Sequence, residues 1–196
     1  MKLRFSAASP YVRKVVVTAI ETGLDGRIEQ LPTDTNDAAL SRENPLGKVP
    51  SLTLDDGTAL YDSPVICEYL DSLHNGTKLF PAAGQARWTA LRRQALGDGI
   101  ADAALSRRME VLRPPSEQSP SWLEKQKQKM TTGFDALEAE VDKLGEGVDI
   151  GLIAIACALG YADLRFADDN WRQGRTKLAR WYERFAERPS MRSTKP

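Results

Sequence analysis

The segment SPYV at residues 9–12 has the residue types and spacing best suited to chemistry in this chain. Proline is favoured at the first position of a helix, because its missing N–H would have no partner there. Serine directly before it is a good N-cap. The hydroxyl of Ser9 is therefore expected at the positive end of a helix, where anions bind favourably.

Two roles are open to Ser9. As a plain N-cap, its oxygen accepts a hydrogen bond from a backbone N–H of the first turn, and this window alone favours that role. Alternatively, its O–H points outward and donates to a bound anion. Because a hydroxyl donates once and accepts twice, the two roles are compatible.

The elements around Ser9 predict a strand–helix–strand unit. Residues 2–5 and 27–31 alternate polar and apolar side chains, which predicts two strands. Between them, the apolar residues of the segment 12–20 recur at helical spacing and form one stripe. Because the connections are short, we expect the two strands to be parallel neighbours with a right-handed crossover.

A hairpin and another helix follow. Strands are predicted at residues 51–54 and 58–61, on either side of the turn DDG, which is a strong hairpin signal. Ser63 and Pro64 then repeat the serine–proline pattern, so Ser63 is the predicted N-cap of a helix that ends near Gly76. The N-terminal third is therefore predicted to be βαβ followed by ββα.

From residue 86 onward the pattern predicts helices only. They are expected from 86 to 112, from 120 to about 144, over the apolar run 150–159, and around 178–185 before Pro189. We therefore predict an α+β fold, a thioredoxin-like domain followed by an all-α helical bundle. The predicted limits are 1–78 for the first domain, 79–85 for the linker and 86–196 for the second.

The composition argues against several classes of function. The chain has 27 basic and 27 acidic residues, so its charge gives no case for nucleic acid or an anionic membrane as a partner. Cys67 and Cys157 lie within apolar helical patterns without a Cys/His cluster, so we expect reduced core thiols and no metal site. The single histidine, His74, is expected to cap a helix end, which argues against a histidine-based triad.

Nothing in the sequence predicts targeting to a membrane. Lys2, Arg4 and Ser6 interrupt the apolar core that a signal peptide needs. The longest apolar run, residues 152–159, is far too short to cross a bilayer. We therefore expect a cytoplasmic protein.

The order of these elements resembles the glutathione S-transferase superfamily, and bacterial members in particular. The resemblance covers essentially the whole chain. Each motif that carries it is weak alone, but the order and spacing of the motifs together are specific. They are SPYVRK at residues 9–14, NPLGKVP at 44–50, Asp62 with Ser63, and AIAC at 154–157.

The resemblance implies a glutathione site built from two further stretches. The bond before Pro50 is expected to be cis, so that the backbone of Val49 pairs with the cysteinyl backbone of glutathione. Ser63 is expected to bind the γ-glutamyl carboxylate, and Asp62 the γ-glutamyl ammonium. Lys48 is the candidate for the glycyl carboxylate, with a solvated surface lysine as the alternative.

The same resemblance gives Ser9 a chemical partner. A free thiol has a pKa near ~8.5, and a donated O–H together with the helix terminus favours the thiolate. Lowering that pKa by ~2 units corresponds to about 2.7 kcal/mol. Ser9 is thus implied to be an activating donor, since no base stands beside it to make it a nucleophile. Glutaredoxin-like relatives carry cysteines where this chain has Ser9 and Val12, which argues against thiol–disulfide exchange.

The leading function is therefore a glutathione transferase that conjugates glutathione to a small electrophile and forms a homodimer. Two alternatives stay open: a non-catalytic glutathione-binding or regulatory protein, and a glutathione-dependent isomerase or dehalogenase. The electrophile is expected between the domains, near Ala104, Arg107, Arg108 and Met109. Paired arginines there favour an anionic co-substrate, unless they simply face water.

Overall fold

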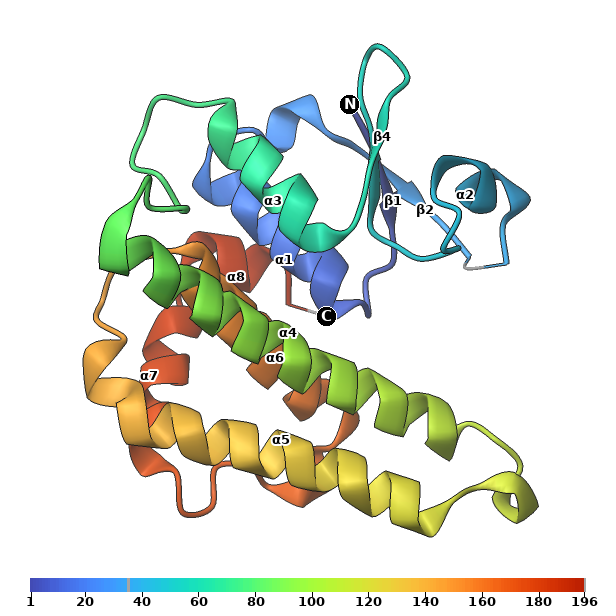
Figure 1. The fold of residues 1–196 in the computed structure, drawn as a ribbon, viewed down its shortest axis with the longest axis vertical. Coiled ribbons are helices and arrows are strands. Elements are labelled where there is room, and N and C mark those ends of the chain that lie inside the picture. The colour runs from blue at the N-terminus through green and yellow to red at the C-terminus, as the bar shows by residue number, and fades with distance from the viewer. Residues whose placement is uncertain (35, 196) are drawn as a thin grey trace.

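The computed structural model describes residues 1–34 and 36–195, and Figure 1 shows a small sheet with helices above a group of longer helices. The strands are β1 (Lys2–Phe5), β2 (Glu29–Pro32), β3 (Ser51–Thr53) and β4 (Ala59–Leu60). Their order is β2-β1-β3-β4. β1 is parallel to β2 and antiparallel to β3, and β3 is antiparallel to β4. This mixed sheet confirms the predicted βαβ unit and hairpin.

Eight α-helices are described. They are α1 (Pro10–Glu21), α2 (Ala38–Glu43), α3 (Ser63–Ser72), α4 (Gly84–Val111), α5 (Pro120–Glu140), α6 (Ile150–Arg165), α7 (Thr176–Ala186) and α8 (Pro189–Ser193). Short 3-10 turns lie at Asp25–Arg27, Pro115–Glu117, Val141–Lys143 and Ala167–Asp169. A sheet-containing N-terminal part followed by helices confirms the predicted fold class. The domain limits stay a prediction.

Several element ends differ from the sequence prediction. β2 begins at Glu29 because the preceding residues form a 3-10 turn. α3 ends at Ser72 rather than near Gly76, and the central helix α6 continues to Arg165. Pro189 does not only follow the last predicted helix: it begins α8, because proline is tolerated in the first turn of a helix.

α6 is the centre of the helical part, and it packs closely against α4. Gly151 of α6 lies against Ala90 of α4, and Gly97 of α4 lies against the backbone of Ala154. A Cβ atom on Gly97 would come within 2.6 Å of the Ala154 carbonyl carbon, so only glycine allows this approach. Because both numbers rise together along the contact, the two helices run in the same direction.

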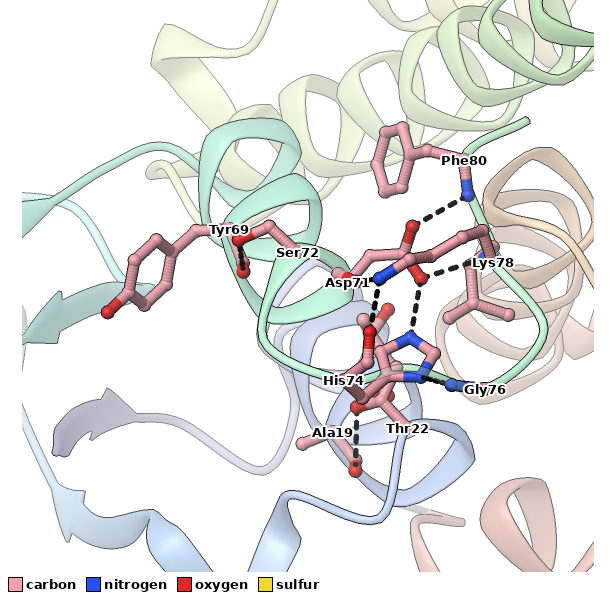
Figure 2. A network of polar contacts seen from close by, with 11 residues as sticks. Ala19, Thr22, Tyr69, Asp71, Ser72, His74, Gly76, Lys78 and Phe80 are labelled. Atoms are coloured by element: carbon pink, nitrogen blue, oxygen red, sulfur yellow. Dashed lines mark hydrogen bonds and ion pairs between the residues drawn. The ribbon is translucent and has the colours of Figure 1, made fainter. Parts of the chain in front are cut away.

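The end of α3 is tied to the chain that leads into α4, as Figure 2 shows. The Asp71 carboxylate accepts hydrogen bonds from the backbone N–H groups of Leu79 (2.8 Å) and Phe80 (3.1 Å). His74 Nε2 lies 2.9 Å from the same carboxylate, and His74 Nδ1 lies 3.1 Å from the backbone nitrogen of Gly76. His74 therefore ties the end of α3 to the following turn.

The connecting chain also contacts α6, because the N–H of Ile150 donates to the carbonyl of Leu79 at 3.0 Å. At the same helix start, Asp149 is the N-cap and accepts from the N–H of Leu152 at 2.8 Å. None of the helices in the described ranges has both the length and the apolar character that crossing a bilayer requires.

Candidate functional site

Ser9 is the N-cap of α1, which confirms the prediction for this residue. Its backbone is extended (φ −83°, ψ 123°), and its Oγ accepts a hydrogen bond from the N–H of Val12 at 3.3 Å. The residue is half-buried. Since Oγ is the acceptor in this hydrogen bond, the hydroxyl proton is available for donation. Capping and activation are therefore compatible in this geometry.

Two polar contacts fix the first turns of α1 against α4. The Tyr11 hydroxyl donates to Asp102, and Lys14 Nζ lies 2.6 and 2.7 Å from the two carboxylate oxygens of Asp98. Lys14 is 1% exposed, so this ion pair is largely removed from water. Sequence reasoning missed both contacts. The available signal was matched spacing, because the donors on α1 are at i and i+3 and the acids on α4 are at i and i+4, so each pair lies on one face of its helix.

The pKa values of these groups reflect their burial. Burial raises the pKa of Tyr11 well above its ordinary value, and the hydrogen bond to Asp102 acts in the same direction. Tyr11 is therefore neutral in the working range of pH. Burial also raises the pKa of Asp98, and the charge of Lys14 opposes that rise.

The loop at residues 44–50 is held by a buried asparagine. The bond between Val49 and Pro50 is cis, as expected. Asn44 is 1% exposed, and its side-chain amide donates to the carbonyl of Lys48 at 2.8 Å and accepts from the N–H of Leu46 at 3.0 Å. Asn44 thus sets the path of the chain into Val49, a role that sequence reasoning missed. An asparagine beside a turn is the usual signal for such contacts.

The same loop is attached to the sheet through Glu43. The Arg4 guanidinium donates twice to its carboxylate, at 3.0 and 2.6 Å, and Thr53 Oγ1 donates to it at 3.1 Å. The hydrogen bond from Arg4 lowers the pKa of Glu43 below its ordinary value. β1 and β3 therefore support the loop that carries Lys48 and Val49. Lys48 is exposed and Val49 is half-buried.

The start of α3 differs from the prediction. Asp62, not Ser63, is the N-cap, and Ser63 is the first residue of the helix. The reason is that the first N–H groups of a helix lack partners, so Pro64 is tolerated at the second helical position as well as at the first. Asp62 is exposed and makes no capping hydrogen bond with its side chain, whereas Ser63 is 2% exposed.

Both cysteines are free and buried, as predicted. Burial raises the pKa of Cys67 to about 11 and that of Cys157 to about 12. Neither thiol forms a thiolate near neutral pH. They therefore cannot supply the nucleophile of the site.

The residues predicted near the electrophile lie in different surroundings. Ala104 is fully buried, and Met109 is 57% exposed. Arg107 forms an ion pair with Asp169, and its guanidinium lies 4.1 Å from the ring centroid of Phe166. Arg108 is half-buried. The predicted arginine pair is thus split, because consecutive residues of a helix point about 100° apart.

Comparison with known proteins gives the family. Residues 8–73 match the model of the glutathione S-transferase N-terminal domain, and residues 120–184 match that of the C-terminal domain. A solved glutathione transferase family member from Pseudomonas fluorescens Pf-5, with bound glutathione, is 46% identical; the match has a TM-score of 0.97 and covers 100% of this chain and 98% of that one. The chain belongs to the glutathione S-transferase family.

Two further relatives of this glutathione S-transferase family member are informative. A second Pf-5 structure, with bound S-(propanoic acid)-glutathione, is 44% identical and has a TM-score of 0.93. The match covers 100% of this chain and 99% of that one. The protein YibF of Escherichia coli K12, named as an uncharacterized GST-like protein, is 35% identical over 200 residues, which span 100% of this chain and 98% of YibF. Family and fold are thereby shown.

Proposed function

We propose that this family member is a glutathione transferase that stabilises the thiolate of glutathione and conjugates it to a small electrophile. The observation that carries the proposal is the geometry of Ser9. Its oxygen accepts from Val12 at the N-terminus of α1, which leaves the hydroxyl proton to donate to a sulfur placed there. The helix terminus favours the same negative charge.

In the proposed mechanism, Ser9 acts on the nucleophile without forming a covalent bond. Glutathione loses its thiol proton to solvent, and the O–H of Ser9 donates to the resulting thiolate. The sulfur then attacks an electrophilic carbon and forms an S–C bond. The leaving group departs with its bonding electron pair, or, at an alkene, the displaced electron pair takes a proton from water.

The rest of the tripeptide is bound, in this proposal, by the loop and by the start of α3. The backbone of Val49 pairs with the cysteinyl backbone, and Asn44 holds the chain in that path. Asp62 binds the γ-glutamyl ammonium, because its carboxylate is exposed and makes no capping hydrogen bond with the helix. The first turn of α3 at Ser63 receives the γ-glutamyl carboxylate. In the same proposal, the exposed Lys48 binds the glycyl carboxylate.

The relatives support both halves of the reaction. The Pf-5 family member has been solved with bound glutathione and with a glutathione thioether, so a closely similar scaffold holds the co-substrate and an S-conjugate. By analogy with its family, we also propose that the protein works as a cytoplasmic homodimer. Sedimentation of the purified protein tests the dimer.

The experiment that tests the function measures glutathione binding and turnover together. The wild-type protein is expected to bind glutathione and to accelerate its reaction with at least one member of a panel containing an aryl halide, an epoxide and an α,β-unsaturated carbonyl. Ser9→Ala should bind glutathione but lose most of the acceleration. Binding without turnover across the panel overturns the transferase proposal in favour of a regulatory role. Products that lack the glutathionyl group indicate an isomerase or a dehalogenase instead.

A further inference from the structure

Arg165, the last residue of α6, has a side-chain nitrogen that the fold leaves without a partner. Its Nε is buried and makes no hydrogen bond within the described residues, although the residue as a whole is only half-buried. A buried N–H donor without an acceptor is unfavourable, because it has lost its hydrogen bond to water without gaining another. The position of Arg165 therefore calls for an acceptor that approaches from outside the chain.

Most arginines near the ends of α4 and α6 are paired. Arg107 is bound to Asp169, Arg172 to both oxygens of Asp163 (2.5 and 2.8 Å), and Arg175 to Asp135 (2.7 Å). Arg108 and Arg165 take part in none of the ion pairs in the part of the chain that the structure describes. These two arginines thus differ from their neighbours in lacking a counter-ion.

The two unpaired arginines lie at the same level of the α4–α6 contact. The helices run in the same direction, and the guanidinium of Arg107 lies over the ring of Phe166. One residue further along α4 is Arg108, and one residue back along α6 is Arg165. Both therefore lie within one residue of the Arg107–Phe166 contact, and Arg165 is the last helical residue before the chain leaves α6 at Phe166.

The start of α1 lies along this end of α4 and runs opposite to it, because Tyr11 binds Asp102 and Lys14 binds Asp98. The Arg165 guanidinium carbon is 5.8 Å from the ring centroid of Tyr161, one turn earlier on α6. Tyr161 follows Gly160, which lies against the guanidinium of Arg13 on α1. Tyr11 is two residues from Ser9 and is bound to Asp102 of α4. Because α1 runs opposite to α4, Arg108 and Arg165 lie beyond these contacts towards the end of α1 that carries Ser9, and this end of α4 and α6 forms the wall beside the proposed thiolate.

The acidic groups on this wall already have partners. Asp102 accepts the hydroxyl of Tyr11, and Asp98 is bound through both oxygens to Lys14. Arg108 and Arg165 take part in none of these contacts and form no ion pair within the described residues, so both are available to an anion from outside the chain. A guanidinium presents its N–H donors in a fork that matches a carboxylate, which makes it a better partner for that group than for a neutral amide.

We propose, building on the proposed transferase function, that Arg165, assisted by Arg108, binds a carboxylate on the electrophile. The substrates are then small electrophiles that carry a carboxylate, such as haloalkanoates or unsaturated acids. With iodoacetate as a probe, the glutathione sulfur forms the S–C bond and iodide leaves with the bonding electron pair. The arginine holds the carboxylate and takes no part in bond breaking.

The test uses two glutathione thioethers that differ only in charge, S-carboxymethyl-glutathione and S-carbamoylmethyl-glutathione. Titration calorimetry should show that the wild type binds the carboxylate about tenfold more tightly than the amide, and that added salt reduces this preference. Arg165→Gln should lose the preference while binding glutathione itself unchanged. Arg108→Gln should reduce it partly. Arg180→Gln, which removes an exposed arginine of α7, is the matched control and should retain it.

The outcomes separate this inference from the proposed function. Equal affinity of the wild type for the two thioethers, or an undiminished preference in Arg165→Gln, overturns the inference and leaves glutathione transfer intact. Failure to bind glutathione at all overturns the proposed function. If Arg165→Gln does not fold by circular dichroism, Arg165→Lys replaces it and should show a weakened preference, because lysine keeps the charge but lacks the fork. Initial rates with iodoacetate and iodoacetamide, each divided by its uncatalysed rate, should follow the same order.

Discussion

The starts of α1 and α3 carry the same serine–proline pair, and the chain folds differently around each. At α1, Ser9 is the N-cap, its oxygen accepts from the first turn, and it remains half-buried. At α3, the helix begins one residue earlier relative to the pair, so that Ser63 lies inside the first turn and is 2% exposed. Asp62 takes the N-cap position there, with its side chain exposed.

A second difference concerns what holds each helix start in place. α1 is attached to α4 by the buried Lys14–Asp98 pair and by the hydrogen bond from Tyr11 to Asp102. The side chain of Asp62 makes no capping bond at α3. The contrast teaches that one helix start is built to hold a hydroxyl rigidly, whereas the other leaves a carboxylate available to a ligand. Four predictions test this contrast.

The largest effect is expected from Lys14→Met, which removes the ion pair between α1 and α4 and leaves the Tyr11–Asp102 hydrogen bond in place. It leaves Asp98 largely buried without its counter-ion, so the free energy of unfolding should fall by about 3 kcal/mol. Denaturant unfolding measures the change. The double variant Lys14→Met/Asp98→Leu should recover much of the loss, because no unpaired charge is left. A loss below about 1 kcal/mol in Lys14→Met contradicts the importance of this contact.

Asp62→Asn should weaken glutathione binding about tenfold, since a charge-assisted contact to the ammonium is replaced by a neutral one. The free energy of unfolding should change by less than about 0.5 kcal/mol, because the carboxylate makes no capping bond. Titration calorimetry and denaturant unfolding measure the two quantities. Glu68→Gln, an exposed acid on the same helix, is the matched control and should alter neither the affinity nor the fold. Equal weakening by both variants would show that Asp62 acts only through overall charge.

Ser9→Ala and Ser63→Ala compare the two serines as contributors to stability. Removing the cap at Ser9 should lower the free energy of unfolding by about 1 kcal/mol. Ser63→Ala should lower it by less, because Ser63 is not the capping residue. Urea unfolding of the two variants side by side measures the difference, and the reverse order contradicts the assigned helix starts.

The smallest effect is expected from Tyr11→Phe. Burial and the bond to Asp102 raise the pKa of Tyr11, so its hydroxyl stays protonated below pH ~10 and is already donated. The pH profile of turnover between pH 6 and about 9 should therefore keep the wild-type midpoint. A shifted midpoint in Tyr11→Phe would mean that Tyr11, rather than Ser9, donates to the sulfur.

Local signals in the sequence were enough for much of the fold. The alternation in residues 2–5, the helical stripe after Pro10 and the DDG turn each depend on neighbouring residues, and each element lies where these signals placed it. The helix start at Ser63 was assigned one residue late. A serine–proline pair is compatible with two starts, since more than one N–H at a helix N-terminus lacks a partner.

The contacts that give the site its shape could not be predicted in the same way. Tyr11 and Asp102 are 91 residues apart, and Lys14 and Asp98 are 84 apart, so only the packing of α1 on α4 brings them together. The arginine pair was recognised on α4, but the turn of the helix sends Arg107 to Asp169. The role that we propose for Arg165, from α6, could not be predicted from the sequence, because it depends on how the two helices pack.

The most direct measurement is the titration of the thiol of bound glutathione by its ultraviolet thiolate absorbance, in the wild type and in Ser9→Ala. The two protein thiols do not interfere, because burial raises the pKa of Cys67 to about 11 and that of Cys157 to about 12. In the wild type, the pKa of the bound glutathione thiol should lie about 2 units below that of free glutathione, equivalent to about 2.7 kcal/mol. In Ser9→Ala, this pKa should rise by most of that difference. An identical titration in the two proteins would contradict the account and leave Ser9 as a helix cap only.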